Sequence, residues 1–176
     1  MTLLDRHMIL FNMTGATVRK IISLTVMAVM GVASVAALGQ GARGFRILDE
    51  APLDRAVDFP RERLVALYRE IEAENISTTR LLEGGEYNVN IRHVENIAPD
   101  SYRTLTHPDT IDVWVVQEGS GTLVTGGEVV DDRHLGGDER FITVGDLIFI
   151  PAGIPHGMKE TRSITWLNIR FPEHRN

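Results

Sequence analysis

The sequence contains no cysteine. Disulfide bonds, thiolate nucleophiles and cysteine-ligated zinc or iron–sulfur sites are therefore excluded, and any metal must be held by nitrogen and oxygen ligands. Basic residues are outnumbered, because 18 Lys and Arg stand against 24 Asp and Glu, and they form no basic stripe. Since a phosphate backbone is bound by such clusters, nucleic acid is not expected as a partner.

Two common catalytic motifs are missing as well. The glycines of residues 126–137 are not followed by the Lys-Ser or Lys-Thr pair of a phosphate-binding loop. No Gly-x-Ser-x-Gly sequence, which would place a serine nucleophile on a sharp turn, occurs in the chain. Nucleotide hydrolysis and serine-dependent acyl transfer are therefore disfavoured.

The first 39 residues have the order of an export signal. The basic pair Arg19-Lys20 precedes an uncharged run over residues 21–37, and small residues then lead to Gln40. This order is typical of a secretory signal peptide, so we expect an exported, periplasmic or secreted protein whose mature chain begins near Gln40. A retained membrane anchor over residues 1–39 is the alternative, because about seventeen apolar residues is the lower limit for crossing a bilayer.

Residues 40–79 are predicted to form an extended arm followed by a helix. The stretch 41–60 mixes charged residues with proline and shows no sustained period. Apolar residues then recur at helical spacing over residues 61–74, which predicts one amphipathic helix that packs on the rest of the fold. The apolar side chains of the arm have no obvious partner within one small barrel, so we expect the arm to lie across a second copy in a homodimer. These side chains are Phe45, Ile47, Leu48 and Phe59.

The rest of the chain has the pattern of an all-β domain. Apolar or alternating runs recur from residue 76 to residue 171 and are separated by Gly, Pro and Asp clusters, and the glycine-rich stretch 126–138 is expected to be a loop. Many short strands with one helix favour a sandwich or a jelly-roll-like barrel, which we place at residues 80–172. The predicted strands are 76–82, 86–95, 101–107, 111–118, 121–126, 140–142, 146–150, 155–160 and 164–171.

The sharpest local pattern begins at Gly145 and ends at His156. An apolar strand leads into the turn Pro151-Ala-Gly153, and this turn fixes the direction of the histidine that follows. The spacing Gly-x5-Pro-x-Gly-x2-His resembles the second motif of the cupin family, except that Glu160 stands at its trailing asparagine.

A preceding stretch resembles the first cupin motif. His107 falls at the position of its second histidine, Asp112 at that of its glutamate and Gly119 at its closing glycine, whereas Leu105 replaces the first histidine. The resemblance implies an all-β double-stranded β-helix over residues 80–172. This fold hosts dioxygenases, isomerases, lyases and plain binding proteins.

His107, Asp112 and His156 are the candidate metal ligands. If the strands turn these side chains inward, two imidazoles and one carboxylate meet on one side of a cation and leave its other positions open. Such a set suits a divalent Fe, Mn, Ni or Zn ion. The expected function is metal-dependent chemistry, of the dioxygenase, isomerase or lyase type, on a small polar organic molecule. Because Leu105 replaces one ligand, a non-catalytic small-molecule-binding module without metal is the alternative.

Other side chains are candidates for substrate binding. Arg103 shares the predicted inward side of its strand with His107, and it could pair with a substrate carboxylate or form a salt bridge at the barrel mouth. Trp114 is expected to form a wall of the substrate pocket. His134 is expected to be a solvated loop residue and His93 a core residue.

Overall fold

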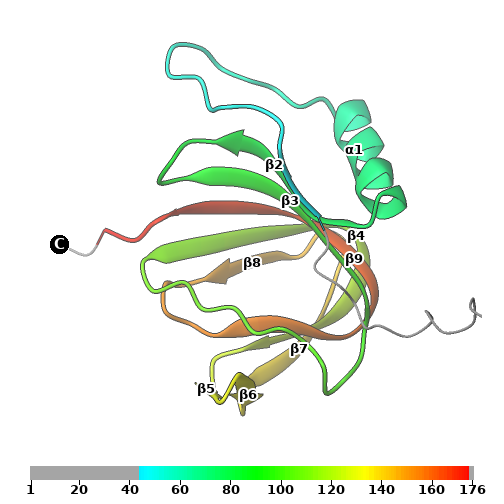
Figure 1. Cartoon of the computed structure of the whole chain (residues 1–176), viewed down its shortest axis with the longest axis vertical. Helices are drawn as coiled ribbons and strands as arrows, with labels where there is room; N and C mark the ends of the chain where they lie inside the picture. The colour runs from blue at the N-terminus through cyan, green and yellow to red at the C-terminus, as the bar shows by residue number, and fades with distance from the viewer. Residues whose placement is uncertain (1–43, 175–176) are drawn as a thin grey trace, which may run out of the picture. The chain divides into compact units, whose positions relative to one another are not determined.

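A computed structural model describes residues 44–174 (Figure 1). The segment for which an export signal is predicted lies outside these residues. Within the described part of the chain, no helix has the length and apolar character needed to cross a membrane. In chain order the elements of this part are β1 (Gly44–Ile47), α1 (Arg61–Ala73), β2 (Ile76–Glu83), β3 (Asn88–Ile97), β4 (Thr110–Thr125), β5 (Glu128–Val130), β6 (Arg133–Leu135), β7 (Asp138–Thr143), β8 (Leu147–Ile150) and β9 (His156–Pro172).

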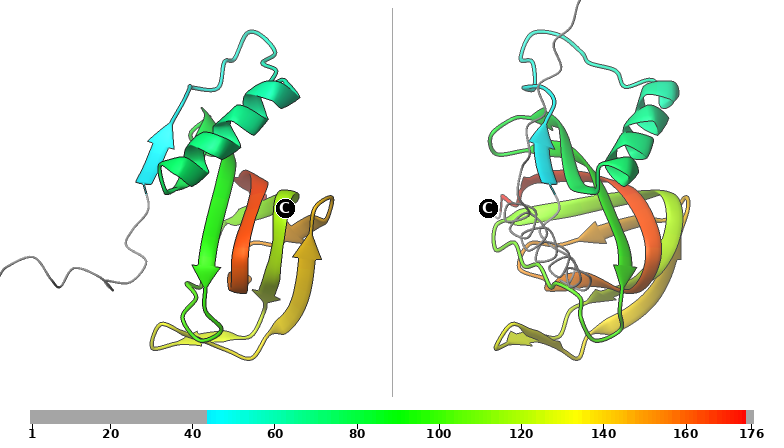
Figure 2. Two further views of the ribbon diagram at one scale, coloured as in Figure 1. Left: turned by 90° about the vertical axis from the view of Figure 1, so that its right-hand side faces the viewer. Right: turned by 45° about the vertical axis from the view of Figure 1, so that its right-hand side comes forward.

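One sheet of seven strands forms the body of the fold. Its order is β1-β2-β3-β9-β4-β7, and β8 pairs with β4 beside this path. The long strands β4 and β9 pair along most of their length, and β4 also pairs with β8 near its start and with β7 near its end. The sheet curls round a shared interior, although the pairings among the described strands do not close into a ring (Figures 1 and 2). The predicted all-β double-stranded β-helix with one short helix is confirmed.

Helix α1 packs on β2 and β3. Pro60 directly precedes the first residue of the helix. Proline has no backbone N–H, and this costs no hydrogen bond here because the first N–H groups of a helix have no partner within it. The spacing of Leu67, Tyr68 and Ile71 places them on one buried face, which contacts Leu81 of β2 and other apolar residues. The amphipathic helix predicted from the sequence is therefore present.

The arm joins the sheet of its own chain, because β1 pairs in parallel with β2. Phe59 packs beside the helix cluster and lies under the Arg63 guanidinium. Phe45, Ile47 and Leu48 nevertheless remain 56%, 47% and 37% exposed. The homodimer stays a prediction, and it now depends on these three side chains.

Strand boundaries differ from the sequence prediction at several places, and in two segments the kind of structure differs. A strand is predicted over residues 101–107, but only Leu105 pairs there, in an isolated antiparallel bridge with His156. The predicted loop at 126–138 contains the hairpin β5–β6. Asp131 and Asp132 have positive φ angles of 50° and 60°, and a two-residue hairpin turn with both central residues in this conformation matches the twist of the flanking strands.

The interior changes from apolar to polar along three neighbouring strands. Side chains alternate between the two faces of a strand, so every second residue of β3, β4 and β9 points inward. The apolar residues of these strands in the interior cluster are Val94, Trp114, Val116, Leu123, Met158, Ile164 and Trp166. Further along the same faces lie Asn90, Arg92, Asp112, Asn168 and Arg170. The polar stretch of this interior is where the candidate site lies.

Candidate metal centre

Backbone hydrogen bonds bring the two candidate histidines together. The Leu105 N–H donates to the His156 carbonyl oxygen at 2.8 Å, and the His156 N–H donates to the Leu105 carbonyl oxygen at 2.9 Å. The Gly153 N–H donates to the His107 carbonyl oxygen at 2.7 Å. Gly153 has a φ of +80°, a conformation that glycine adopts without strain. The irregular segment that carries His107 is therefore held against the turn that precedes His156.

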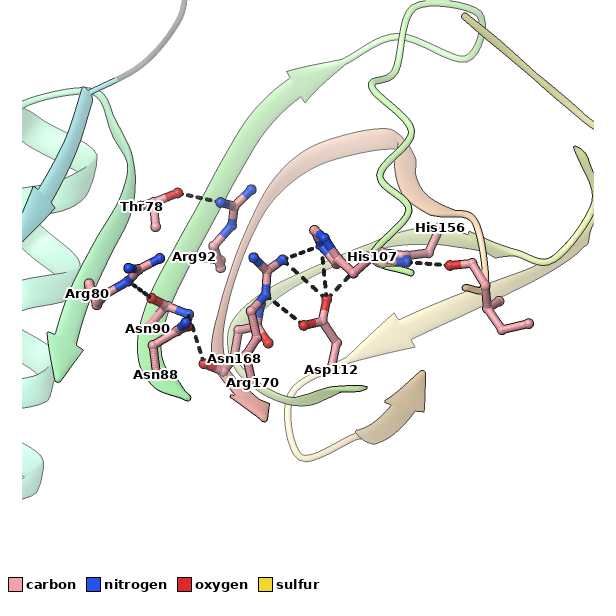
Figure 3. A network of polar contacts seen from close by, with 11 residues as sticks. Thr78, Arg80, Asn88, Asn90, Arg92, His107, Asp112, His156, Asn168 and Arg170 are labelled. Atoms are coloured by element: carbon pink, nitrogen blue, oxygen red, sulfur yellow. Dashed lines mark hydrogen bonds and ion pairs between the residues drawn. The ribbon is translucent and has the colours of Figure 1, made fainter. Parts of the chain in front are cut away.

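Asp112 of β4 completes the cluster. Its side chain is 1% exposed, and its Oδ2 atom lies 3.3 Å from His156 Nε2 and 3.7 Å from His107 Nε2. One potential ligand atom from each of the three residues lies within 4.8 Å of the other two (Figure 3). The structure thus brings the three predicted metal ligands together, and their role as ligands stays a prediction.

The imidazole of His156 is held in one tautomer. Its Nδ1 lies 2.9 Å from the Ile154 carbonyl oxygen, and since a carbonyl only accepts, Nδ1 carries the proton. In the neutral ring, Nε2 then presents a lone pair toward Asp112 Oδ2. This Nε2 is buried and has no hydrogen-bond partner among the described residues. Two facing acceptors are satisfied by a proton on Nε2 or by a cation bound between them, so this donor set fits a metal ion.

Arg170 of β9 is a further member of the cluster that sequence reasoning missed. It lies opposite Asp112 in the β4–β9 register. Its Nε donates to Asp112 Oδ1 at 2.6 Å and its Nη2 to Asp112 Oδ2 at 3.3 Å. The same Nη2 lies 2.6 Å from His107 Nε2, which must accept because a guanidinium only donates. Arg170 therefore occupies the lone pair through which His107 would bind a metal.

The surroundings shift the pKa values of both partners of Arg170. Burial, followed by repulsion from Arg170, lowers the pKa of His107 to about 4. For Asp112 burial alone would raise the pKa, but the close approach of the His156 imidazole and the Arg170 guanidinium outweigh it and hold the pKa below its usual value. At neutral pH the cluster thus contains a neutral His107 and an ionised Asp112, the protonation states that metal ligation requires.

The structure also places the remaining sequence candidates. Trp114 is buried, meets the His156 ring edge-on at 5.5 Å between centroids, and packs on Trp166. Arg103 is exposed. His134 lies in β6, where its Nε2 contacts the Gly126 carbonyl oxygen and it borders a separate cavity of about 590 Å³.

His93 is buried on β3, outside the cluster. Its Nδ1 lies 2.9 Å from Thr165 Oγ1. His93 is thus in the core, as the sequence predicts.

Comparison with known proteins identifies similar folds only. No family model and no curated protein matches the chain. Similar solved structures include a Bacillus halodurans protein, at 21% identity over 66% of this chain and 86% of that chain, with a TM-score of 0.46. Hydroxypropylphosphonic acid epoxidase from S. wedmorenis, in complex with fosfomycin, is 17% identical over 53% of this chain and 50% of its own, with a TM-score of 0.46. The cupin domain of Schizosaccharomyces pombe Cnp3 is 6% identical over 55% and 64%, with a TM-score of 0.42.

A cupin domain and a protein with a double-stranded β-helix domain are among the similar solved structures. The chain spans about half the length of the epoxidase. At these levels of identity the likeness concerns the fold, and the functional argument therefore depends on the residues of this chain.

Proposed function

We propose that the protein binds a divalent metal ion through His107, Asp112 and His156 and acts on a small polar organic molecule beside it. The observation that carries this proposal is the close approach of His156 Nε2 and Asp112 Oδ2, which lie 3.3 Å apart in the interior while His156 Nδ1 contacts the Ile154 carbonyl oxygen. When the imidazole is neutral, this buried pair of acceptors is stabilised by a cation.

The ligand set supports several reactions. Two imidazoles and a carboxylate leave open positions, and the set is compatible with Fe, Mn, Ni or Zn. When bound, the metal supplies Lewis acidity, which polarises a substrate or activates oxygen or water. Around it, Arg170 orients the Asp112 carboxylate, and Trp114 packs against His156. Dioxygenase, isomerase and lyase chemistry are the reaction types that we propose for this arrangement.

A metal-free binding module is the second candidate, and Arg170 is the observation that favours it. Its guanidinium already hydrogen-bonds to His107 Nε2 and to both oxygens of Asp112. A permanent cation in this position can balance Asp112 without a metal. In this case the site binds its small molecule without catalysis.

Elemental analysis after separate loading with Fe(II), Mn(II), Ni(II) and Zn(II) separates the two candidates. We expect the wild type to retain near-stoichiometric metal after desalting, and His107→Ala, Asp112→Ala and His156→Ala to lose most of it. The His134→Ala control should retain the metal, because that imidazole lies outside the cluster. His93→Ala should also retain it, provided that its circular dichroism shows a folded chain.

Two outcomes would contradict the metal proposal. One is a wild type that takes up none of the four cations above background, which would make the binding module the leading function. The other is equal retention by the wild type and the three ligand variants, which would place the metal elsewhere in the chain.

A further inference from the structure

Arg92 is an inward-facing arginine that forms no ion pair within the described residues. It lies on β3, and the strand alternation places it on the same face as the buried Asn90 and as Val94, which packs against the interior core. Its Nη1 donates to the hydroxyl of Thr78 on β2. No carboxylate within residues 44–174 forms an ion pair with it.

Two neighbouring arginines, unlike Arg92, do contact a carboxylate. Arg80 forms an ion pair with Glu83, and Arg170 hydrogen-bonds to Asp112. In Figure 3 the Arg92 guanidinium is turned toward Thr78, and the Arg170 guanidinium on the neighbouring strand is turned toward His107 and Asp112. A guanidinium carries five N–H donors, so one hydroxyl partner leaves most of the donors of Arg92 without an acceptor among residues 44–174.

The charges of this group do not balance. Burial, followed by repulsion from Arg170, lowers the pKa of Arg92 to about 10 in spite of attraction by Asp112, so the side chain is still protonated at neutral pH. Asp112 is the carboxylate of the cluster, and Arg170 already engages both of its oxygens. A divalent cation on the candidate ligands would increase the positive excess. A partly buried charge without a counter-charge is unfavourable unless an anion approaches it.

We propose that Arg92, together with Arg170, forms an oxyanion subsite, and that the small molecule bound beside His107, Asp112 and His156 carries a carboxylate or phosphate group. The planar fork of Arg92 offers two parallel donors to two oxygens of such a group. The inference rests on the proposed function in that the molecule occupies the same site, but the subsite itself requires only the two guanidinium groups. This inference narrows the proposed substrate class from polar molecules in general to organic acids or phosphate esters.

Calorimetric titration of the full chain tests the subsite. The probes are malonate, inorganic phosphate and, as an uncharged isostere, malonamide, each added to chelator-treated and to metal-loaded protein. We expect at least one anion to bind, malonamide to bind at least tenfold more weakly, and added salt to weaken anion binding. A preference for malonate or for phosphate identifies which oxyanion the subsite selects.

Substitutions locate the binding. Arg92→Gln keeps a donor for Thr78 but removes the charge, and it should weaken anion binding by about tenfold or more, the loss typical of a charge-assisted hydrogen bond. Arg92→Lys should retain part of the affinity. The control Arg162→Gln removes an exposed charge from β9 and should leave the affinity unchanged. Thermal unfolding should show that Arg92→Gln is at least as stable as the wild type, because it removes a partly buried charge that forms no ion pair within residues 44–174.

Two results would overturn the inference: no anion binding in either metal state, or binding that is unchanged in a folded Arg92→Gln variant. Anion binding by a protein that takes up no metal would uphold the subsite and refute the metal proposal. Metal uptake without anion binding would uphold the metal proposal and refute the subsite. The two proposals therefore fail separately.

Discussion

His107 should make the free energy of unfolding of the metal-free protein depend on pH between 6.5 and about 4. In the folded state its pKa is lowered from 6.5 to about 4, first by burial and then by Arg170. Within this window the unfolded chain binds a proton at His107 and the folded chain does not, so the free energy of unfolding falls as the pH falls. The difference between 6.5 and 4, at about 1.4 kcal/mol for each pH unit, amounts to about 3 kcal/mol.

Other side chains also titrate in this window, so the effect must be isolated by a variant. His107→Gln removes the titrating group but keeps an oxygen that can accept from Arg170 Nη2. The pKa of Asp112 is held below its usual value, so this carboxyl stays ionised through most of the window. Urea unfolding with a chelator present should be measured for both proteins at several values between pH 7 and pH 4.

We expect the wild type to lose about 3 kcal/mol more than His107→Gln over this range, with little further difference below pH 4. Equal losses in the two proteins would refute the reasoning. They would mean that burial and the Arg170 contact do not hold His107 neutral in the folded state, and the bond from Arg170 Nη2 to His107 Nε2 would then be wrong.

Two predictions concern the first sixty residues. N-terminal sequencing of protein from its native host should find a start near Gln40 if the leader is removed on export, and a full-length chain in the membrane fraction would contradict this. Light scattering at tens of micromolar should show a homodimer, because Phe45, Ile47 and Leu48 are exposed on or next to a strand at the edge of the sheet. Replacing these three residues with Ser should produce a monomer, and an unchanged mass would place any interface elsewhere.

Local backbone chemistry explains why much of the fold could be predicted. Gly145, Pro151 and Gly153 restrict the chain so strongly that their spacing alone predicts a strand, a turn and the direction of His156. The hairpin turn at Asp131 and Asp132 could not be predicted in the same way, since aspartate adopts a positive φ less often than glycine. The sequence pattern divides the long strands β4 and β9 into two pieces each, whereas both strands continue through register shifts between Val116 and Glu118 and between Ser120 and Thr122.

Arg170 and Arg92 were missed because their roles depend on which strands become neighbours. Arg170 ends an alternating series with Ile164, Trp166 and Asn168, and this parity is the one signal in the sequence that it points inward. The sequence does not show that β9 lies between β3 and β4, and this long-range pairing is what brings Arg92 and Arg170 to a common site. Motif comparison finds ligands at fixed spacing, whereas the charges around them come from strands far apart in the chain.

The position of Arg170 implies that metal and anion binding are coupled. A divalent cation held by His107, Asp112 and His156 would lie close to the Arg170 guanidinium, and repulsion between the two would weaken metal binding. An oxyanion bound by Arg170 and Arg92 would offset this repulsion, so each ligand should strengthen the binding of the other by the same factor. A chain with Leu105 at the first ligand position of the motif would then hold its metal most tightly when the acidic small molecule is present.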